Sequence, residues 1–130
     1  MPVVLTAWSW VSIGTNDLAA ACHFWVDTLG FECTDLIEGD DPGLREHWQL
    51  TDRLICRQAM LQSPGAAFGA IHLVEYDTAT ATVRQDAAVF DLCPKNLDIY
   101  VDDLPLRMAE LTARGVRFRN EQYSEAVSPD

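Results

Sequence analysis

The sequence has few basic residues and no long apolar run. Nine lysines and arginines stand against twenty aspartates and glutamates among 130 residues, which gives a formal net charge of −11. Nucleic-acid binding requires a clustered basic surface, so this composition argues against it. The same charge disfavours binding to an anionic membrane surface. Because no apolar run approaches ~20 residues, we expect no membrane-spanning helix.

Several chemical signatures are also missing. There is no Gly-rich phosphate loop, no Walker motif and no GxSxG element. The first ten residues, MPVVLTAWSW, lack the basic segment and cleavage site of a signal peptide. We therefore expect a cytoplasmic protein with free, mostly buried thiols. The cysteines show neither CxxC nor zinc-ligand spacing, and they are Cys22, Cys33, Cys56 and Cys93.

The residues that are present predict one globular domain over residues 1–130. Apolar residues make up 48% and charged residues 22% of the chain, which is enough apolar material for a core. The length fits one domain and is too short for a TIM barrel or a two-domain Rossmann enzyme. The acidic balance is compatible with a cationic ligand, although solubility alone is the favoured explanation for it.

The first 76 residues predict the order β-α-β-β-β. Alternation over residues 7–14 places Trp10 and Ser12 on one face of a first strand. Apolar residues then recur at helical spacing from Leu18 until Gly30 ends the helix. Three further strands are expected at residues 31–38, 54–62 and 69–76, with a short helical turn at 44–50.

A similar pattern restarts after a connector at residues 77–95. A strand is expected at 96–101, a helix from Leu104 to Gly115, and a short strand at 116–120. Both halves share an Asp-Leu pair, an amphipathic helix, and a glycine followed directly by a strand. This pattern indicates an internal repeat. Module one covers about 7–76 and module two 96–130. By this count the second module is short of one or two strands at its C-terminal end.

This repeat resembles the vicinal oxygen chelate superfamily, which includes glyoxalase I, extradiol dioxygenases and bleomycin-binding resistance proteins. The resembling segments are NDLAAACHFWVDTLGFE, GAIHLVEYD and LDIYVDDLPLRMAELTARGVRF. The resemblance implies an α+β fold of paired βαβββ modules, whose curved mixed sheets surround a cleft. It also implies swapped or side-by-side pairing of chains, so a homodimer is expected.

In the enzymes of this superfamily, the cleft holds one divalent metal on the first and last strands of each module. The resemblance places three of these ligand positions at Trp10, His72 and Asn96. The fourth position falls on a final strand of module two that the sequence does not show. Indole has no lone pair for a metal, and an amide is a poor ligand for transition metals. Asp98 could lend one oxygen. Metal ligation thus has only His72 and Asp98 as weak candidates, and no cofactor is favoured, although a divalent metal remains open.

The candidate ligand-binding residues are those expected to line the cleft: Trp10, Ser12, His72, Asn96 and Asp98. Of these, His72 is also the candidate catalytic base. Each residue has a structural alternative. The histidine could be satisfied inside a core, the tryptophan could simply pack, and Asp98 could be an exposed edge carboxylate. We expect Trp8 to pack between sheet and helix. His23 and His47 are expected on the surface.

Two functions of different classes follow. The first is a metal-independent binding protein of the glyoxalase/bleomycin-resistance type, which holds a cationic or aromatic small molecule in the cleft. The alternative is a metal-dependent lyase, isomerase or dioxygenase, in which the metal would chelate two substrate oxygens. Whether the protein is an enzyme is left open by the sequence. A third hypothesis is that the chain forms the non-catalytic half of a larger protein.

Overall fold

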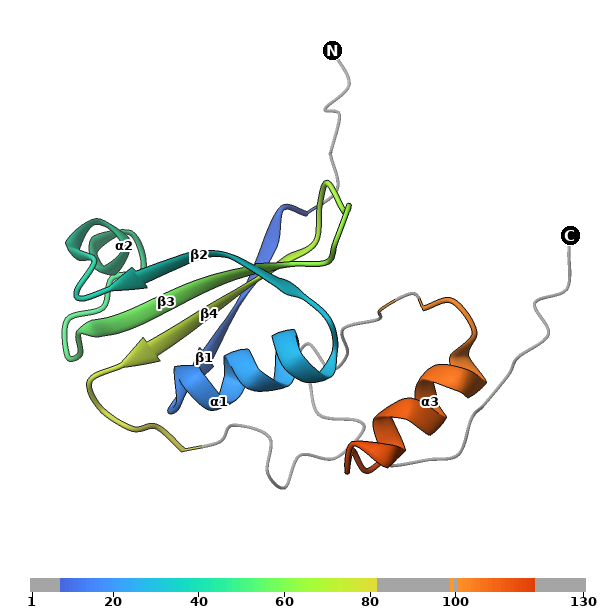
Figure 1. The fold of residues 1–130 in the computed structure, drawn as a ribbon. Helices are drawn as coiled ribbons and strands as arrows, with labels where there is room; N and C mark the ends of the chain where they lie inside the picture. The colour runs from blue at the N-terminus through green and yellow to red at the C-terminus, as the bar shows by residue number, and fades with distance from the viewer. Residues whose placement is uncertain (1–7, 82–98, 100, 119–130) are drawn as a thin grey trace, which may run out of the picture. The chain divides into compact units, whose positions relative to one another are not determined.

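The computed structural model describes residues 8–81, 99 and 101–118. Contacts divide the chain into two compact units, residues 1–85 and 86–130. The elements of the first unit are shown in Figure 1 and are β1 (Trp10–Thr15), α1 (Leu18–Cys22), a π-helical segment η1 (His23–Thr28), β2 (Glu32–Glu38), α2 (Pro42–His47), β3 (Ile55–Gln62) and β4 (Ala70–Tyr76). The second unit contains α3 (Leu104–Ala113).

The described residues of the first unit form a four-stranded mixed sheet with the strand order β1-β4-β3-β2. Strand β1 runs parallel to β4, while β3 is antiparallel to both β4 and β2. A parallel pair needs a long crossover connection, and the chain between β1 and β4 supplies it. The predicted β-α-β-β-β order is therefore confirmed, and the expected α+β class with a mixed sheet is observed.

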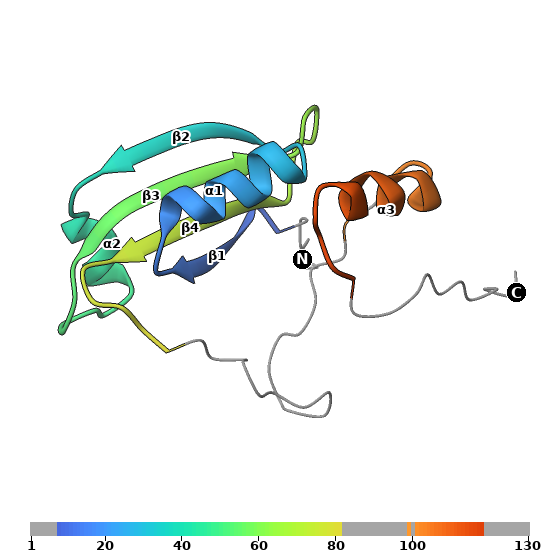
Figure 2. The same ribbon diagram turned by 60° about the horizontal axis from the view of Figure 1, so that its bottom comes forward.

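Helix α1 and its continuation η1 cover one face of the sheet (Figures 1 and 2). Leu18, Phe31 and four strand residues form the buried cluster on this face, and Trp25 packs against it. The four strand residues are Ala59, Leu61, Ile71 and Leu73. Burial of this apolar surface is the main force that fixes the helix on the sheet.

The ends of the first helical segment follow the expected signals. Asp17 is the N-cap and its carboxylate accepts a hydrogen bond from the amide of Ala20 at 2.9 Å. Gly30 follows the helix with φ of +83°, a conformation that glycine adopts without strain. The helical periodicity did not reveal that residues 23–28 are π-helical, because both helix types place apolar side chains on one face.

The second unit agrees with the sequence in its helix and differs in its strands. Helix α3 begins after the N-cap Asp103 and ends before Gly115, as expected. The predicted strand at 116–120 is wrong over residues 116–118, which pair with no strand in the described part of the chain. Of the predicted strand at 96–101, only Ile99 and Val101 are described, and neither is in a strand. The expected connector and module boundary fall largely outside the described residues.

Two predictions about side-chain burial are also wrong. Trp8 was expected between sheet and helix, but it is 54% exposed, and its ring lies beside Gly69. Cys33 was expected to be a buried thiol, yet it is exposed because the edge strand β2 is exposed along its whole length. Cys22 and Cys56 are half-buried and free.

Candidate functional site

The face of the sheet opposite α1 carries two polar side chains of the central strands, Gln58 and His72. Trp10 and Ser12 alternate with the half-buried Val11 and Ile13 along β1, so they share this outer face. In the parallel register Ser12 lies directly beside His72 of β4. His72 in turn lies opposite Met60 of β3.

His72 is the centre of a hydrogen-bonded group. Its Nδ1 lies 3.0 Å from the hydroxyl oxygen of Ser12, and its Nε2 lies 2.9 Å from the side-chain oxygen of Gln58. His72 is 8% exposed and Gln58 is 3% exposed. Both ring nitrogens are thus engaged within the sheet. Burial lowers the pKa of His72 below its ordinary value of 6.5, while the negative charge of Asp41 opposes that shift.

Asp41 extends this group to helix α2. One of its carboxylate oxygens accepts the amide of Leu44 at 2.9 Å and caps the helix, and the other accepts the side-chain amide of Gln58 at 3.3 Å. The bonds from Leu44 and Gln58 lower the pKa of Asp41 below its usual value. A continuous chain of hydrogen bonds therefore runs from α2 across β3 and β4 to β1, and we name it the Asp41–Ser12 relay.

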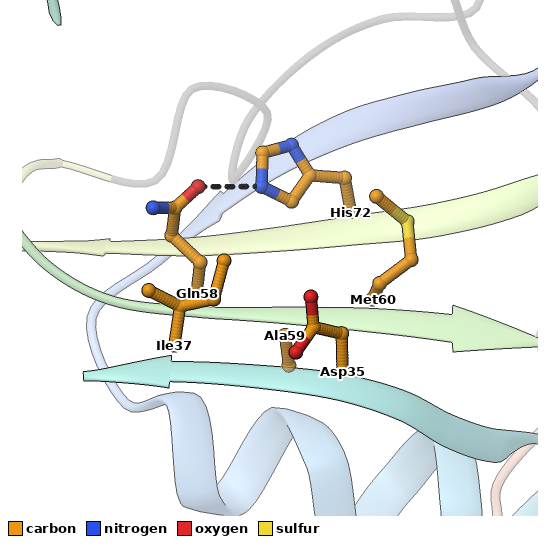
Figure 3. A pocket seen from close by; sticks show the side chains of 6 residues that line it. All are labelled: Asp35, Ile37, Gln58, Ala59, Met60 and His72. Atoms are coloured by element: carbon orange, nitrogen blue, oxygen red, sulfur yellow. Dashed lines mark hydrogen bonds between the residues drawn. The ribbon is translucent and has the colours of Figure 1, made fainter. Parts of the chain in front are cut away.

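A small pocket opens beside this relay on the same face (Figure 3). Its lining combines the relay residues with apolar and acidic side chains, namely Asp35, Ile37, Gln58, Ala59, Met60 and His72. Trp48, which caps the C-terminal end of α2, places its ring centroid 5.9 Å from that of His72. The pocket lining thus includes the thioether of Met60, the imidazole of His72 and the carboxylate of Asp35.

The structure brings together three of the five predicted ligand-binding residues. Trp10, Ser12 and His72 lie on adjacent strands of one face. Trp10 is 55% exposed, which excludes ordinary core packing within the described residues. The other two, Asn96 and Asp98, lie outside the described residues.

Sequence reasoning missed Gln58, Met60 and Asp41. Residues 54–62 were correctly predicted as a strand, but its two faces were not assigned. A glutamine in the middle of an apolar strand was the available signal, because buried amides are hydrogen-bonded. Asp41 lies in an acid-rich stretch of the sequence, and no local signal singled it out. In the structure it caps α2, and its neighbour Asp40 binds Arg45 through two oxygens.

The described residues do not fit a metal centre. No three histidine, cysteine, aspartate or glutamate side chains among them are grouped as metal ligands. His72, the candidate ligand by resemblance, already has hydrogen-bond partners on both nitrogens. Indole at the neighbouring ligand position, Trp10, has no lone pair to offer.

Within the described residues, no helix is both long and apolar enough to cross a membrane.

Comparison with known proteins places this arrangement in a known fold. No protein-family model and no curated protein sequence matches the chain. A glyoxalase family protein from Bacillus cereus is 22% identical over 94% of this chain and 82% of its own, with a TM-score of 0.77. An antibiotic-binding protein, TnmS3, from Streptomyces sp. CB03234 is 22% identical over 95% and 82%, with a TM-score of 0.57.

A third structure supports the same conclusion. A glyoxalase/bleomycin resistance protein from Streptomyces sp. CB03234 is 23% identical over 91% of this chain and 82% of its own, with a TM-score of 0.51. The agreement over most of each chain, at low identity, concerns the backbone. This chain therefore has the fold of these glyoxalase and bleomycin-resistance proteins.

Proposed function

We propose that this protein binds a small molecule on the sheet face opposite α1 and that it does so without a metal ion. The observation that carries the proposal is the place of Trp10. Trp10 is 55% exposed on the face that also holds the hydrogen-bonded Ser12–His72 pair. An exposed aromatic surface beside a few fixed polar groups suits ligand binding, because the ring supplies contact area and the polar groups supply orientation.

The chemistry of the face favours an aromatic ligand with positive charge. Stacking on an indole contributes about 0.5–1.5 kcal/mol beyond the burial of area. The carboxylate of Asp35 lines the neighbouring pocket, and the chain carries a net charge of −11, so a cation gains from the electrostatic field. One of the structurally similar proteins is described as antibiotic-binding, which supports a small-molecule ligand here.

The test is a ligand screen by thermal shift and calorimetry, started with cationic aromatic compounds. Hits are then measured against Trp10→Ala. We expect the affinity to fall about tenfold, as one stacking partner is lost. The matched control is Phe24→Ala, which removes an exposed aromatic ring from η1 on the helix side of the sheet. Unchanged affinity in Trp10→Ala would remove this residue from the site.

Elemental analysis of protein never exposed to chelator or nickel resin separates this proposal from its alternative. The alternative is a metal-dependent lyase, isomerase or dioxygenase with His72 as catalytic residue. Near-stoichiometric Fe, Mn, Zn, Ni or Co would favour that alternative and overturn metal-free binding. We expect neither bound metal nor a thermal shift on adding divalent ions.

The proposal includes a homodimer in the cytoplasm. Within the described residues, β1 and β2 are the two edges of the sheet, and unpaired strand edges favour association. Size-exclusion chromatography with light scattering measures the mass directly. A monomer at micromolar concentration would contradict the dimer and leave ligand binding unaffected.

A further inference from the structure

The direction of every hydrogen bond in the Asp41–Ser12 relay follows from its first member. Asp41 has a lowered pKa and is ionised at neutral pH, so both of its oxygens only accept. The group of Gln58 that faces it at 3.3 Å must therefore be the amide NH₂. This fixes the other end of the same side chain, and Gln58 presents its carbonyl oxygen to His72 at 2.9 Å.

The acceptor oxygen that faces Nε2 determines which tautomer His72 adopts. The ring is buried and neutral at pH 7, so it carries a single N–H. Because Gln58 offers only a carbonyl oxygen, that hydrogen must be on Nε2 (Figure 3). Nδ1 then holds a lone pair, and it accepts the hydroxyl hydrogen of Ser12 at 3.0 Å.

The last member of the relay faces the ligand side. The hydrogen of the Ser12 hydroxyl is committed to His72, and the exposed oxygen keeps its lone pairs. No other hydrogen bond of this hydroxyl occurs within the described residues. Ser12 therefore acts toward solvent as an acceptor, next to the indole of Trp10 two residues earlier on the same face.

We propose that Asp41 and Gln58 are positioning residues that set the direction of the Ser12 hydroxyl, so that the site selects aromatic ligands which bring an N–H or O–H donor to Ser12. This inference rests on the proposed function, because it assumes that the outer sheet face binds the ligand. It adds that the ligand carries a hydrogen-bond donor. It also names Asp41 and Gln58 as the residues that impose this requirement through His72.

Nitrogen-15 NMR of the histidine rings tests the relay without any ligand. In the wild-type protein we expect His72 as the Nε2–H tautomer. Asp41→Asn keeps an N-cap, since asparagine caps helices well. Its Oδ1 would still accept the Leu44 amide, so its NH₂ would face Gln58 and reverse that side chain. We expect His72 to change to the Nδ1–H tautomer.

The control for this variant is Asp52→Asn, which removes the same charge from an exposed residue outside the relay. It should leave the tautomer of His72 unchanged. An Nδ1–H tautomer in the wild-type protein, or one that Asp41→Asn does not alter, would overturn the positioning role. Either result would stand independently of whether a ligand is ever found.

Two nearly isosteric probes test the ligand class, namely indole with an N–H donor and benzofuran with a ring oxygen. Titration is followed by NMR at the Ser12 amide. We expect the wild-type protein to bind indole about fivefold to tenfold more tightly, which is the range of one net hydrogen bond. Ser12→Ala should abolish this difference. Asp41→Asn should reduce it, because the Ser12 hydroxyl, once it accepts from Nδ1–H of His72, can donate its hydrogen to a ligand and can still accept with its remaining lone pair.

The outcomes separate this inference from the proposed function. Equal affinity for the two probes in the wild-type protein would overturn donor selection while keeping the binding face. If neither probe binds while the tautomer exchange occurs, the proposed binding face and the ligand class are overturned and the positioning role of Asp41 and Gln58 is supported.

Discussion

Ser12 and His72 are direct register partners in the parallel strands β1 and β4, and their side chains meet with Oγ 3.0 Å from Nδ1. Sixty residues of sequence separate them. The pairing exists only because the crossover through α1, β2, α2 and β3 returns the chain beside its first strand. This contact joins the predicted binding residues of β1 to the buried polar group of the central strands.

The burial of His72 predicts a pH dependence of stability. Its pKa in the folded protein lies below the ordinary value of 6.5, so the unfolded chain takes up the proton at a higher pH. The contribution of His72 to the free energy of unfolding is therefore complete above about pH 6.5 and is lost as the pH falls toward the pKa of the folded protein. The free energy of unfolding changes by at most about 1.4 kcal/mol per pH unit from this one group. Asp41 and Asp35 are the other charged groups facing this region. The lowered pKa of Asp41 keeps that carboxylate ionised through this interval.

Chemical denaturation between pH 4.5 and pH 8 measures this effect. His72→Gln is the comparison, because glutamine can still hydrogen-bond with both neighbours but does not titrate. We expect the free energy of unfolding of the wild-type protein to fall more steeply on acidification than that of the variant. Parallel curves for the two proteins would show that His72 does not titrate differently on folding.

Glu75 is predicted to stabilise the first unit strongly. Its Oε2 accepts the amide of Leu18 at 2.6 Å and the guanidinium of Arg57 at 2.7 Å, and its side chain is 16% exposed. It thereby joins the start of α1 to strands β3 and β4. Glu75→Gln should lower the free energy of unfolding by about 1–3 kcal/mol, because a charge-assisted pair and a helix-end acceptor are both weakened.

The matched control is Glu110→Gln on α3, where the carboxylate binds Arg107 at 2.7 Å but is 43% exposed. An exposed pair contributes about 0–1 kcal/mol, so this variant should remain close to the wild-type protein. Urea denaturation compares the two. If the exposed variant lost as much stability as Glu75→Gln, burial would not be the deciding factor.

Gly30 is predicted to be required for its backbone conformation. Its φ is +83°, and no atom would lie within 4 Å of an added Cβ, so a substitution meets no steric obstacle. Gly30→Ala should cost about 1 kcal/mol, from the left-handed conformation alone. Gly43→Ala in the first turn of α2 is the control, because Gly43 has no positive φ and the added Cβ makes only an ordinary contact.

Thermal unfolding of the two alanine variants measures this difference. Gly43→Ala should be neutral or slightly stabilising, since alanine reduces the entropy of the unfolded chain. Equal melting temperatures for the two variants would contradict a conformational role for Gly30.

Local patterns in the sequence determined the elements of the first unit. Alternation at Trp10 and Ser12 predicted β1, helical spacing from Leu18 predicted the helix, and Gly30 predicted its end. These signals act over one to four residues, through side-chain direction, capping and backbone conformation. The resemblance carried by these segments also predicted the fold and drew attention to His72.

Tertiary structure alone decided which polar groups meet. Gln58 lies 14 residues from His72 and 17 from Asp41 in sequence, and no local rule indicates either partner. Their contact depends on the antiparallel register of β3 with β4 and on the position of α2 at the end of the sheet. Likewise, Trp8 and Trp10 remain exposed because α1 covers the other face, and an alternating pattern does not state which face a helix will cover.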